Sequence, residues 1–262
     1  ADASGNGHDG SLVNGPTWTQ GKIGGALSFD GTNDHVALGN PPALNLTGTQ
    51  STSMWLKPLS LNARRNPYAK AYGGTGTFTL ETNGHLSYYY GTAGGNAQPY
   101  ASYTTGTPLG TNVWSNVVLV RDLDAMKVQY YVNGSLANTQ NATYASATAG
   151  NLDAFIGKGY VSPFHGLIDD FRIYDRILSA AEVAALYNHE KPVAAAGNQS
   201  APVEPAFLPQ GLVAYYPFDG NASDMSGNGN HGKILSAKFG TDRFLRPKRC
   251  LVPTGLNTAL TS

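Results

Sequence analysis

The chain has 262 residues, with 17 lysines and arginines against 17 aspartates and glutamates, so its formal net charge is zero. Charged residues make up 13% of the chain, against about 25% in an average soluble domain. A chain this weakly charged lacks the basic surface that phosphate backbones attract, which argues against a nucleic-acid partner. No apolar run approaches the ~20 residues that span a bilayer, so we expect a soluble protein without membrane insertion.

Short strands and tight turns dominate the first two thirds of the chain. Glycine (32) and tyrosine (15) are abundant, and the single cysteine cannot form an internal disulfide. Apolar segments, alternating or continuous, recur between Gly, Asn, Asp and Pro, as is typical of a sandwich or jelly roll. The predicted strands are Ala26–Phe29, His35–Leu38, Ser51–Leu56, Thr77–Glu81, Leu86–Tyr90, Asn116–Arg121, Lys127–Val132, Asp153–Ile156 and Leu167–Tyr174.

One helix is predicted after these strands. Ser179 can cap its first turn, Glu182 three residues later completes a capping box, and Pro192 ends it. The helix is short and amphipathic, so we expect it to pack against the sheets. We therefore predict an all-β protein, a two-sheet antiparallel jelly-roll sandwich with one short C-terminal helix, over residues 1–190.

The remainder of the chain is predicted to hold a linker and part of a second copy. Residues 191–210 are rich in Ala and Pro, which indicates an extended linker. Residues 224–232 then repeat residues 2–10 with six identities in nine positions, so we interpret residues 211–262 as a truncated second copy. Because the first copy lacks the strand that precedes this repeat, we predict that strand 211–218 fills the first-strand position, within one chain or as a strand-swapped homodimer.

A set of short motifs occurs in a characteristic order along the chain. The motifs are Asp2-Ala3-Ser4-Gly5-Asn6-Gly7, Ala26-Leu27-Ser28-Phe29-Asp30-Gly31, Met54-Trp55-Leu56-Lys57-Pro58, Trp114-Ser115-Asn116-Val117, Tyr131-Val132-Asn133-Gly134 and Gly166-Leu167-Ile168-Asp169-Asp170-Phe171-Arg172-Ile173-Tyr174-Asp175-Arg176. The order resembles the laminin G-like jelly-roll domains of the concanavalin A-like lectin and glucanase superfamily. This resemblance implies a fold shared by lectins, adhesion modules, carbohydrate-binding modules and glycosidases, in a secreted or cell-surface multidomain protein of bacterial type.

The first motif is a candidate metal-binding loop. Asp2, Ser4 and Asn6 place oxygen-bearing side chains at alternate positions before a glycine, as calcium loops do. In a helix-flanked calcium loop a glutamate closes the site eleven residues after the first aspartate, but Val13 stands there. The missing carboxylates must therefore come from another part of the chain.

The resemblance supplies the candidate donors. On a regular strand Asp169 and Asp170 point to opposite faces, so only one can join the loop. The resemblance favours Asp169, with Asp30 as a second candidate, and implies a structural calcium held with Asp2 and Asn6. The alternative is that the loop residues form Asx and Ser turns while Asp169 pairs with an arginine.

Catalysis has little support in the sequence. The glucanases that this chain resembles carry Glu-x-Asp-x-x-Glu or close variants on one strand, and no such run occurs here. Of the four glutamates, Glu182 is a helix cap, Glu190 and Glu204 fall at or within the linker, and Glu81 is alone on a strand. No serine elbow and no zinc-type histidine spacing is present. Weak metal-assisted hydrolysis of glycosides or activated esters stays an alternative, and a structural spacer is a third.

Tyrosines form the densest candidate binding group. Alternation along a strand sends Tyr88 and Tyr90 to one face and Tyr89 to the other. Aromatic rings stack on the apolar faces of sugars, although the same tyrosines could simply pack between strands. The candidate ligand-binding residues are Tyr72, Tyr88, Tyr89, Asn96, Tyr100 and Tyr103. We thus predict a non-catalytic carbohydrate- or cell-surface-binding module of a larger extracellular protein, with a structural calcium.

Overall fold

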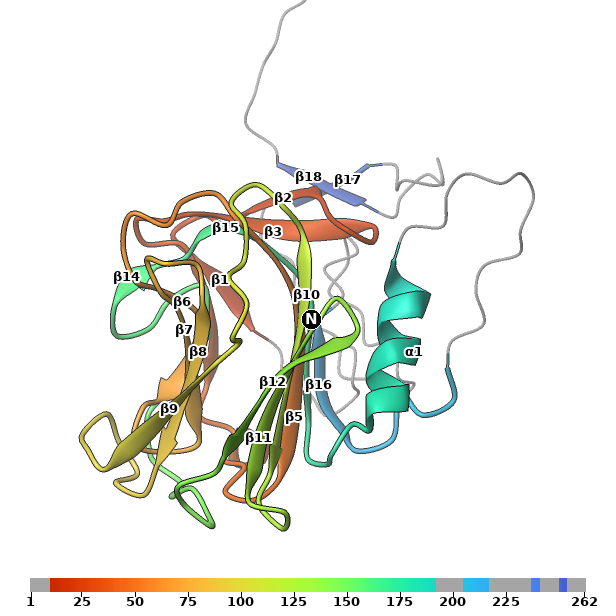
Figure 1. The fold of residues 1–262 in the computed structure, drawn as a ribbon. Helices are drawn as coiled ribbons and strands as arrows, with labels where there is room; N and C mark the ends of the chain where they lie inside the picture. Colours follow the sequence, from red (N-terminus) through yellow and green to blue (C-terminus); the bar gives the residue numbers. More distant parts are fainter. Residues whose placement is uncertain (1–9, 192–204, 217–236, 241–249, 254–262) are drawn as a thin grey trace, which may run out of the picture.

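The computed structural model describes residues 10–191, 205–216, 237–240 and 250–253. Two sheets face each other across a buried core, and the helix lies on the outer side of one of them (Figure 1). Apart from the short β14, every strand pairing in the two sheets is antiparallel. The predicted all-β jelly-roll sandwich is confirmed for the described residues.

We call the two layers the front sheet and the back sheet. The front sheet has the order β1 (Ser11–Val13), β4 (His35–Gly39), β13 (Ala154–Ile156), β6 (Arg65–Ala71), β7 (Gly76–Leu80), β8 (Leu86–Gly91) and β9 (Tyr100–Thr104), with β14 (Ser162–Pro163) beside β6. The back sheet has the order β12 (Ser135–Asn141), β11 (Lys127–Val132), β10 (Ser115–Asp122), β5 (Gln50–Pro58), β15 (His165–Tyr174), β3 (Gly25–Asp30) and β2 (Thr17–Gln20), with β16 (Leu212–Tyr216) beside β15. The other elements are η1 (Pro42–Leu44), α1 (Ala180–Glu190), β17 (Ala237–Gly240) and β18 (Cys250–Pro253).

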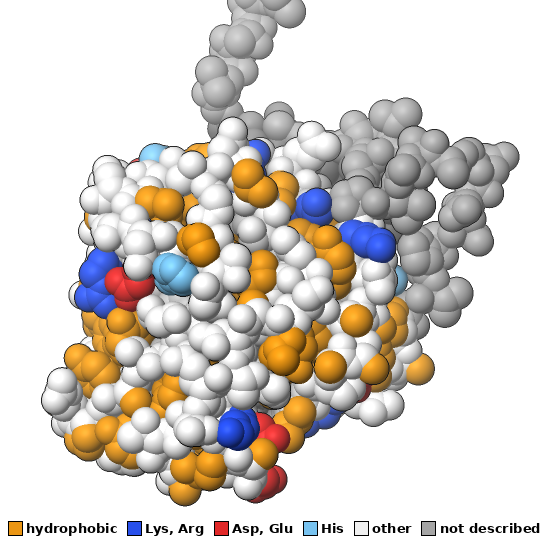
Figure 2. Space-filling view, in the orientation of Figure 1, with side chains coloured by type: hydrophobic (Ala, Val, Ile, Leu, Met, Phe, Trp, Pro, Cys, Tyr) orange, Lys and Arg blue, Asp and Glu red, His pale blue; other side chains and the backbone are white. Residues whose placement is uncertain are grey.

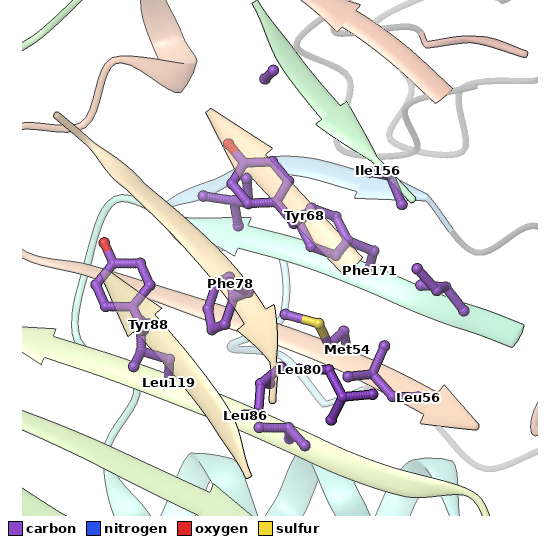
Figure 3. Close-up of a cluster of buried hydrophobic side chains, with 14 of the residues drawn as sticks. Met54, Leu56, Tyr68, Phe78, Leu80, Leu86, Tyr88, Leu119, Ile156 and Phe171 are labelled. Carbon is purple, nitrogen blue, oxygen red and sulfur yellow. The ribbon is translucent and has the colours of Figure 1, made fainter. Parts of the chain in front are cut away.

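The inward-facing side chains of the two sheets form one hydrophobic core. Met54 from β5 and Phe78 from β7 lie in this core with no exposed surface (Figure 3). Tyr68 of the front sheet stacks on Phe171 of the back sheet with ring centroids 5.1 Å apart. Burial of these large side chains, at about 25 cal/mol per Å² of apolar surface, holds the sheets together.

A polar anchor sits within this core at Tyr88. Its hydroxyl donates to the carbonyl oxygen of Thr75 at 2.9 Å and accepts hydrogen bonds from Gln50 Nε2 at 3.0 Å and Arg121 at 2.9 Å. Gly76 passes so close that a Cβ there would lie 2.4 Å from the hydroxyl oxygen, and its φ of +137° also favours glycine. The ring is therefore fixed in both position and direction.

Removing this hydroxyl should destabilise the fold. The Tyr88→Phe variant removes three buried hydrogen bonds, and we expect a loss of roughly 1–3 kcal/mol in unfolding free energy. Gln50 Nε2 loses its hydroxyl acceptor, while the Thr75 carbonyl oxygen and Arg121 Nη1 keep only the bond to each other at 3.0 Å. Tyr130→Phe is the matched control, because Tyr130 is equally buried and its hydroxyl has no hydrogen-bond partner among the described residues. Chemical denaturation of both variants is the measurement, and equal losses would contradict the anchor.

Helix α1 begins and ends as the sequence predicts. The Ser179 hydroxyl accepts from the main-chain N–H of Glu182 at 3.2 Å, and the Glu182 carboxylate accepts from the main-chain N–H of Ser179 at 2.8 Å. The helix covers the outer face of the back sheet, where Tyr187 stacks on Trp55 at 5.8 Å. With 11 residues it is too short to cross a membrane, and the described residues contain no other helix that could.

A buried ionic cluster fastens the end of this helix to the sheet. Glu190 contacts Arg172, accepts from Trp55 Nε1 at 2.7 Å and lies within 3.5 Å of Asn116 Nδ2. Arg172 also pairs with Asp170 at 3.1 Å. Glu190, expected at the boundary between the domain and the linker, is the last residue of α1, and the last turn of this helix carries it into the protein with 2% exposure.

This cluster should make stability depend on pH. Burial raises the pKa of Glu190 from 4.5 to about 7; the Arg172 guanidinium opposes this shift, but it is shared with Asp170, whose negative charge adds to the shift. The folded state then keeps a proton that the unfolded state loses near pH 4.5, so the free energy of unfolding falls as pH rises through this window.

The measurement is the melting temperature at about pH 5 and pH 8, where we expect Glu190 to lower wild-type stability by on the order of 3 kcal/mol at the higher pH. The decrease should shrink in Glu190→Gln. Glu182→Gln is the control, because the pKa of Glu182 is lowered and its titration lies outside this window. A decrease of the same size in all three proteins would overturn the assignment.

Part of the predicted linker packs on the domain. Leu208 is 3% exposed, and Arg176 donates to the carbonyl oxygens of Phe207 and Gln210. The following strand, β16, pairs with the second half of β15, on the side where β3 pairs with the first half. The observed strand covers Leu212–Tyr216, and residues 217 and 218 lie outside the described residues. That strand 211–218 fills the first-strand position, within one chain or by exchange between two chains, stays a prediction. The repeated motif at 224–232 lies outside the described residues.

Candidate ligand-binding site on the front sheet

The predicted alternation in β8 is observed. Tyr88 lies in the core of the sandwich (Figure 3), and neither it nor Tyr90 has exposed surface, whereas Tyr89 is partly exposed on the outer face. Tyr103 stands directly opposite Tyr88 in the ladder, so it also points inward, stacks on Tyr90 at 5.4 Å and is 2% exposed. Tyr88 and Tyr103 are therefore core residues, and their assignment to a binding site is wrong.

Four tyrosines meet on the outer face, and we call them the tyrosine platform: Tyr72, Tyr89, Tyr100 and Tyr160. Tyr72 lies at the centre, with ring centroids 4.9 Å from Tyr89, 5.8 Å from Tyr100 and 5.7 Å from Tyr160. Tyr89 and Tyr100 also meet edge to face at 5.9 Å. The platform brings together residues from β8, β9 and two connecting segments of the front sheet.

Buried polar groups hold the platform from below. The hydroxyl of Tyr72 lies 2.9 Å from Thr79 Oγ1 and 3.4 Å from Asn66 Nδ2. Asn66 has no exposed surface, and its Oδ1 accepts from the main-chain N–H of Tyr160 at 2.8 Å. Asn96 Oδ1 accepts from the main-chain N–H of Tyr72 at 3.2 Å. The same few amides therefore position both Tyr72 and the segment that carries Tyr160.

Exposure separates the supporting rings from those open to a ligand. Tyr72 is only 9% exposed, so its role is to hold its three neighbours in place. Tyr160 is 37% exposed, Tyr89 and Tyr100 are partly exposed, and Asn96 is exposed beside them. Surface for a ligand thus comes from Tyr89, Tyr100, Tyr160 and Asn96.

An ion pair borders the platform. Arg64 Nε lies 2.7 Å from Glu81 Oε2, and a terminal guanidinium nitrogen donates to Glu81 Oε1 at 3.2 Å and to the Tyr89 hydroxyl at 3.0 Å. Tyr89 in turn donates to Glu81 Oε1 at 2.9 Å. Although burial opposes it, these bonds lower the pKa of Glu81, while burial and the bond to Glu81 raise the pKa of Tyr89 to about 12. Glu81 is therefore ionised and Tyr89 protonated at neutral pH.

Three members of this site were not predicted: Arg64, Tyr160 and, as a binding residue, Glu81. Arg64 and Glu81 meet because β6 and β7 pair with Arg65 opposite Leu80, and sequence periodicity does not give cross-strand registers. Tyr160 follows Gly159, which packs against Asn66, and this glycine was the available signal.

Asp169, the metal donor that the resemblance favours, is a buried residue of β15. It has no exposed surface, and its Oδ2 accepts from the main-chain N–H groups of Lys22 at 2.7 Å and Ile23 at 3.0 Å. The other proposed ligands in the loop, Asp2 and Asn6, lie outside the described residues. Within the described ranges no three His, Cys, Asp or Glu side chains converge on a metal-sized site.

Asp30 does not join Asp169. In the ladder between β3 and β15 Asp30 stands opposite His165, so about 13 Å of strand separates it from Asp169 at roughly 3.3 Å per residue. Its carboxylate instead accepts from the main-chain N–H groups of Thr32 and Asn33. Asp30 and Asp169 thus lie at separate places along β15, and a metal-ligand role for Asp30 stays a prediction.

A family model described as the Concanavalin A-like lectin/glucanases superfamily matches residues 30–184. The chain belongs to this superfamily. A search of curated proteins finds no match. The superfamily assignment accounts for the two facing sheets and confirms the resemblance in the motif order.

Solved structures share this fold at low sequence identity. Domain 4 of AbnA, a GH43 extracellular arabinanase from Geobacillus stearothermophilus solved with arabinotriose, is 22% identical with a TM-score of 0.52 and covers 68% of this chain and 82% of its own. The CBM40 of a Ruminococcus gnavus sialidase, bound to α2,3-sialyllactose, is 16% identical with a TM-score of 0.51, covering 62% and 96%. The binding domain of Paraclostridial Mosquitocidal Protein 1 is 14% identical with a TM-score of 0.57, and the match covers 69% of this chain and 47% of the toxin domain.

Proposed function

We propose that this chain is a non-catalytic carbohydrate-binding module of an extracellular protein, and that the tyrosine platform is its ligand-binding surface. The observation that carries the proposal is the meeting of Tyr89, Tyr100 and Tyr160 on one open sheet face, bordered by hydrogen-bonding groups. Aromatic rings bind the C–H faces of sugars, while amide, carboxylate and guanidinium groups bind their hydroxyls.

Two features of the comparisons support a glycan ligand. The arabinanase domain and the sialidase module were solved with bound oligosaccharides, and both share the fold. They differ in sugar, which is consistent with a scaffold whose ligand is set by the side chains on its surface. The extracellular setting stated for the arabinanase supports the same setting for this chain.

The platform is suited to binding because little ordering is needed. The rings of Tyr72, Tyr89 and Tyr100 already pack against one another, and the Tyr89 hydroxyl is fixed by Arg64 and Glu81. A ligand that lies on these rings therefore avoids much of the side-chain entropy cost, which is about 0.5–1.5 kcal/mol for each immobilised side chain.

The test is glycan binding with and without the exposed rings. An oligosaccharide array identifies ligands, and calorimetry then measures the affinity of Tyr100→Ala and Tyr160→Ala. We expect roughly tenfold weaker binding in each, corresponding to about 1.4 kcal/mol. Leu136→Ala, which removes a 55%-exposed apolar side chain from β12 of the back sheet, is the control. Unchanged affinity in both tyrosine variants would reject the platform as the site.

We also propose a structural calcium held by Asp169 together with Asp2 and Asn6. Asp169 supports it as a buried carboxylate at the position that the resemblance favours. Chelation should lower the wild-type melting temperature by several degrees, because an ion that binds only the folded state stabilises it by mass action. The same chelator should leave the melting temperature of Asp169→Asn unchanged. A wild-type protein insensitive to chelator would remove the proposal.

A further inference from the structure

The charges next to the platform are already compensated. Arg64 contacts the platform through the Tyr89 hydroxyl, and its guanidinium is bound at the same time by both oxygens of Glu81. Arg64 is 46% exposed at its side chain and Glu81 20%, so the pair stands at the edge of the surface that a ligand would reach. A ligand there meets an ion pair with no net charge.

The neighbouring ammonium groups are also directed elsewhere. Lys70 is 1% exposed, and its Nζ donates to Asn40 Oδ1 at 2.5 Å and to the carbonyl oxygen of Leu152 at 3.0 Å. The Nζ of Lys158 lies 5.2 Å from the ring centroid of Phe155. Phe155 belongs to β13, which β6 separates from β7 and β8. Figure 2 shows few charged side chains on the visible surface, and several of them lie as adjacent blue and red groups among uncharged ones.

We infer that the tyrosine platform selects neutral oligosaccharides and discriminates against sugars that carry a carboxylate. This inference rests on the proposed glycan-binding function. The ion pair of Arg64 with Glu81 is its structural basis. In other proteins this fold accommodates both neutral and acidic ligands.

The physical reason is desolvation. A neutral sugar can lie on Tyr100 and Tyr160 while its own hydroxyl groups donate to Glu81 and accept from Arg64. Every polar group of the sugar and of the ion pair then keeps a partner. A sugar carboxylate would have to displace Glu81 from Arg64 or lose water without gaining a cation. A site that leaves such a charge without a partner discriminates strongly between otherwise similar ligands.

The experiment compares ligands that differ only in charge. Galactotriose against trigalacturonate, and the methyl ester of sialyllactose against sialyllactose itself, form matched neutral and acidic probes for calorimetry. We expect the neutral member to bind at least about tenfold more tightly, equivalent to ~1.4 kcal/mol. In Glu81→Gln the guanidinium is released from its carboxylate, so the ratio of acidic to neutral affinity should rise at least about fivefold.

Glu182→Gln is the control variant, because Glu182 forms a comparable ion pair with Arg176 at 2.9 Å at the start of α1, away from the front sheet. Its acidic-to-neutral ratio should match that of the wild type. Tighter or equal binding of the acidic probe by the wild type, or an unchanged ratio in Glu81→Gln, overturns the selectivity while leaving glycan binding intact. Failure of every probe and of the glycan array to bind rejects the proposed function itself.

Discussion

The direction of one side chain, Tyr88, determines what the front sheet presents to solvent. Its hydroxyl is tied inside the sandwich to Thr75, Gln50 and Arg121, which come from the β6–β7 turn, β5 and β10. Because successive strand residues point to opposite faces, fixing Tyr88 inward fixes Tyr89 outward. A register slip of one residue would bury Tyr89 and break all three bonds. The polar anchor in the core and the aromatic surface outside are thus two consequences of the same register.

The outer faces of the two sheets differ in what covers them. On the back sheet α1 covers the outer face, and the cluster of Glu190, Arg172 and Trp55 holds its last turn in place. On the front sheet the tyrosines that lie outward pack against one another and keep part of their rings exposed. The back face is thereby closed by the chain itself, and the front face is the one that offers aromatic surface to a partner.

Local sequence signals predicted the elements that local interactions stabilise. They did not predict the elements whose side chains are buried against groups far away in the sequence. The strand Lys127–Val132 and the capping box at Ser179 follow from periodicity and from one side-chain oxygen, and both are observed at the predicted residues. Strand β6 was not predicted, and Arg65 and Lys70 near its two ends are residue types that rarely lie in a buried strand. Both are buried, and they donate to carbonyl oxygens far away in the sequence, Arg65 to that of Pro163 in β14 and Lys70 to that of Leu152. No pattern within β6 contains that information, and the Arg64 part of the site was missed for the same reason.

The few charged side chains of the chain have specific partners both in the interior and at the surface. With 13% charged residues, the buried cations are each matched to a specific environment: Arg121 donates to the carbonyl oxygens of Gly48, Leu46 and Thr75 and lies 5.0 Å from the Tyr90 ring centroid. Such matching avoids the large free-energy cost of a charge that loses water without gaining partners. The same constraint operates at the border of the tyrosine platform, where a guanidinium is held by a carboxylate and a hydroxyl. For the proposed glycan ligand, a surface built this way offers stacking and neutral hydrogen bonding, so we expect recognition to depend on shape and hydroxyl geometry more than on charge attraction.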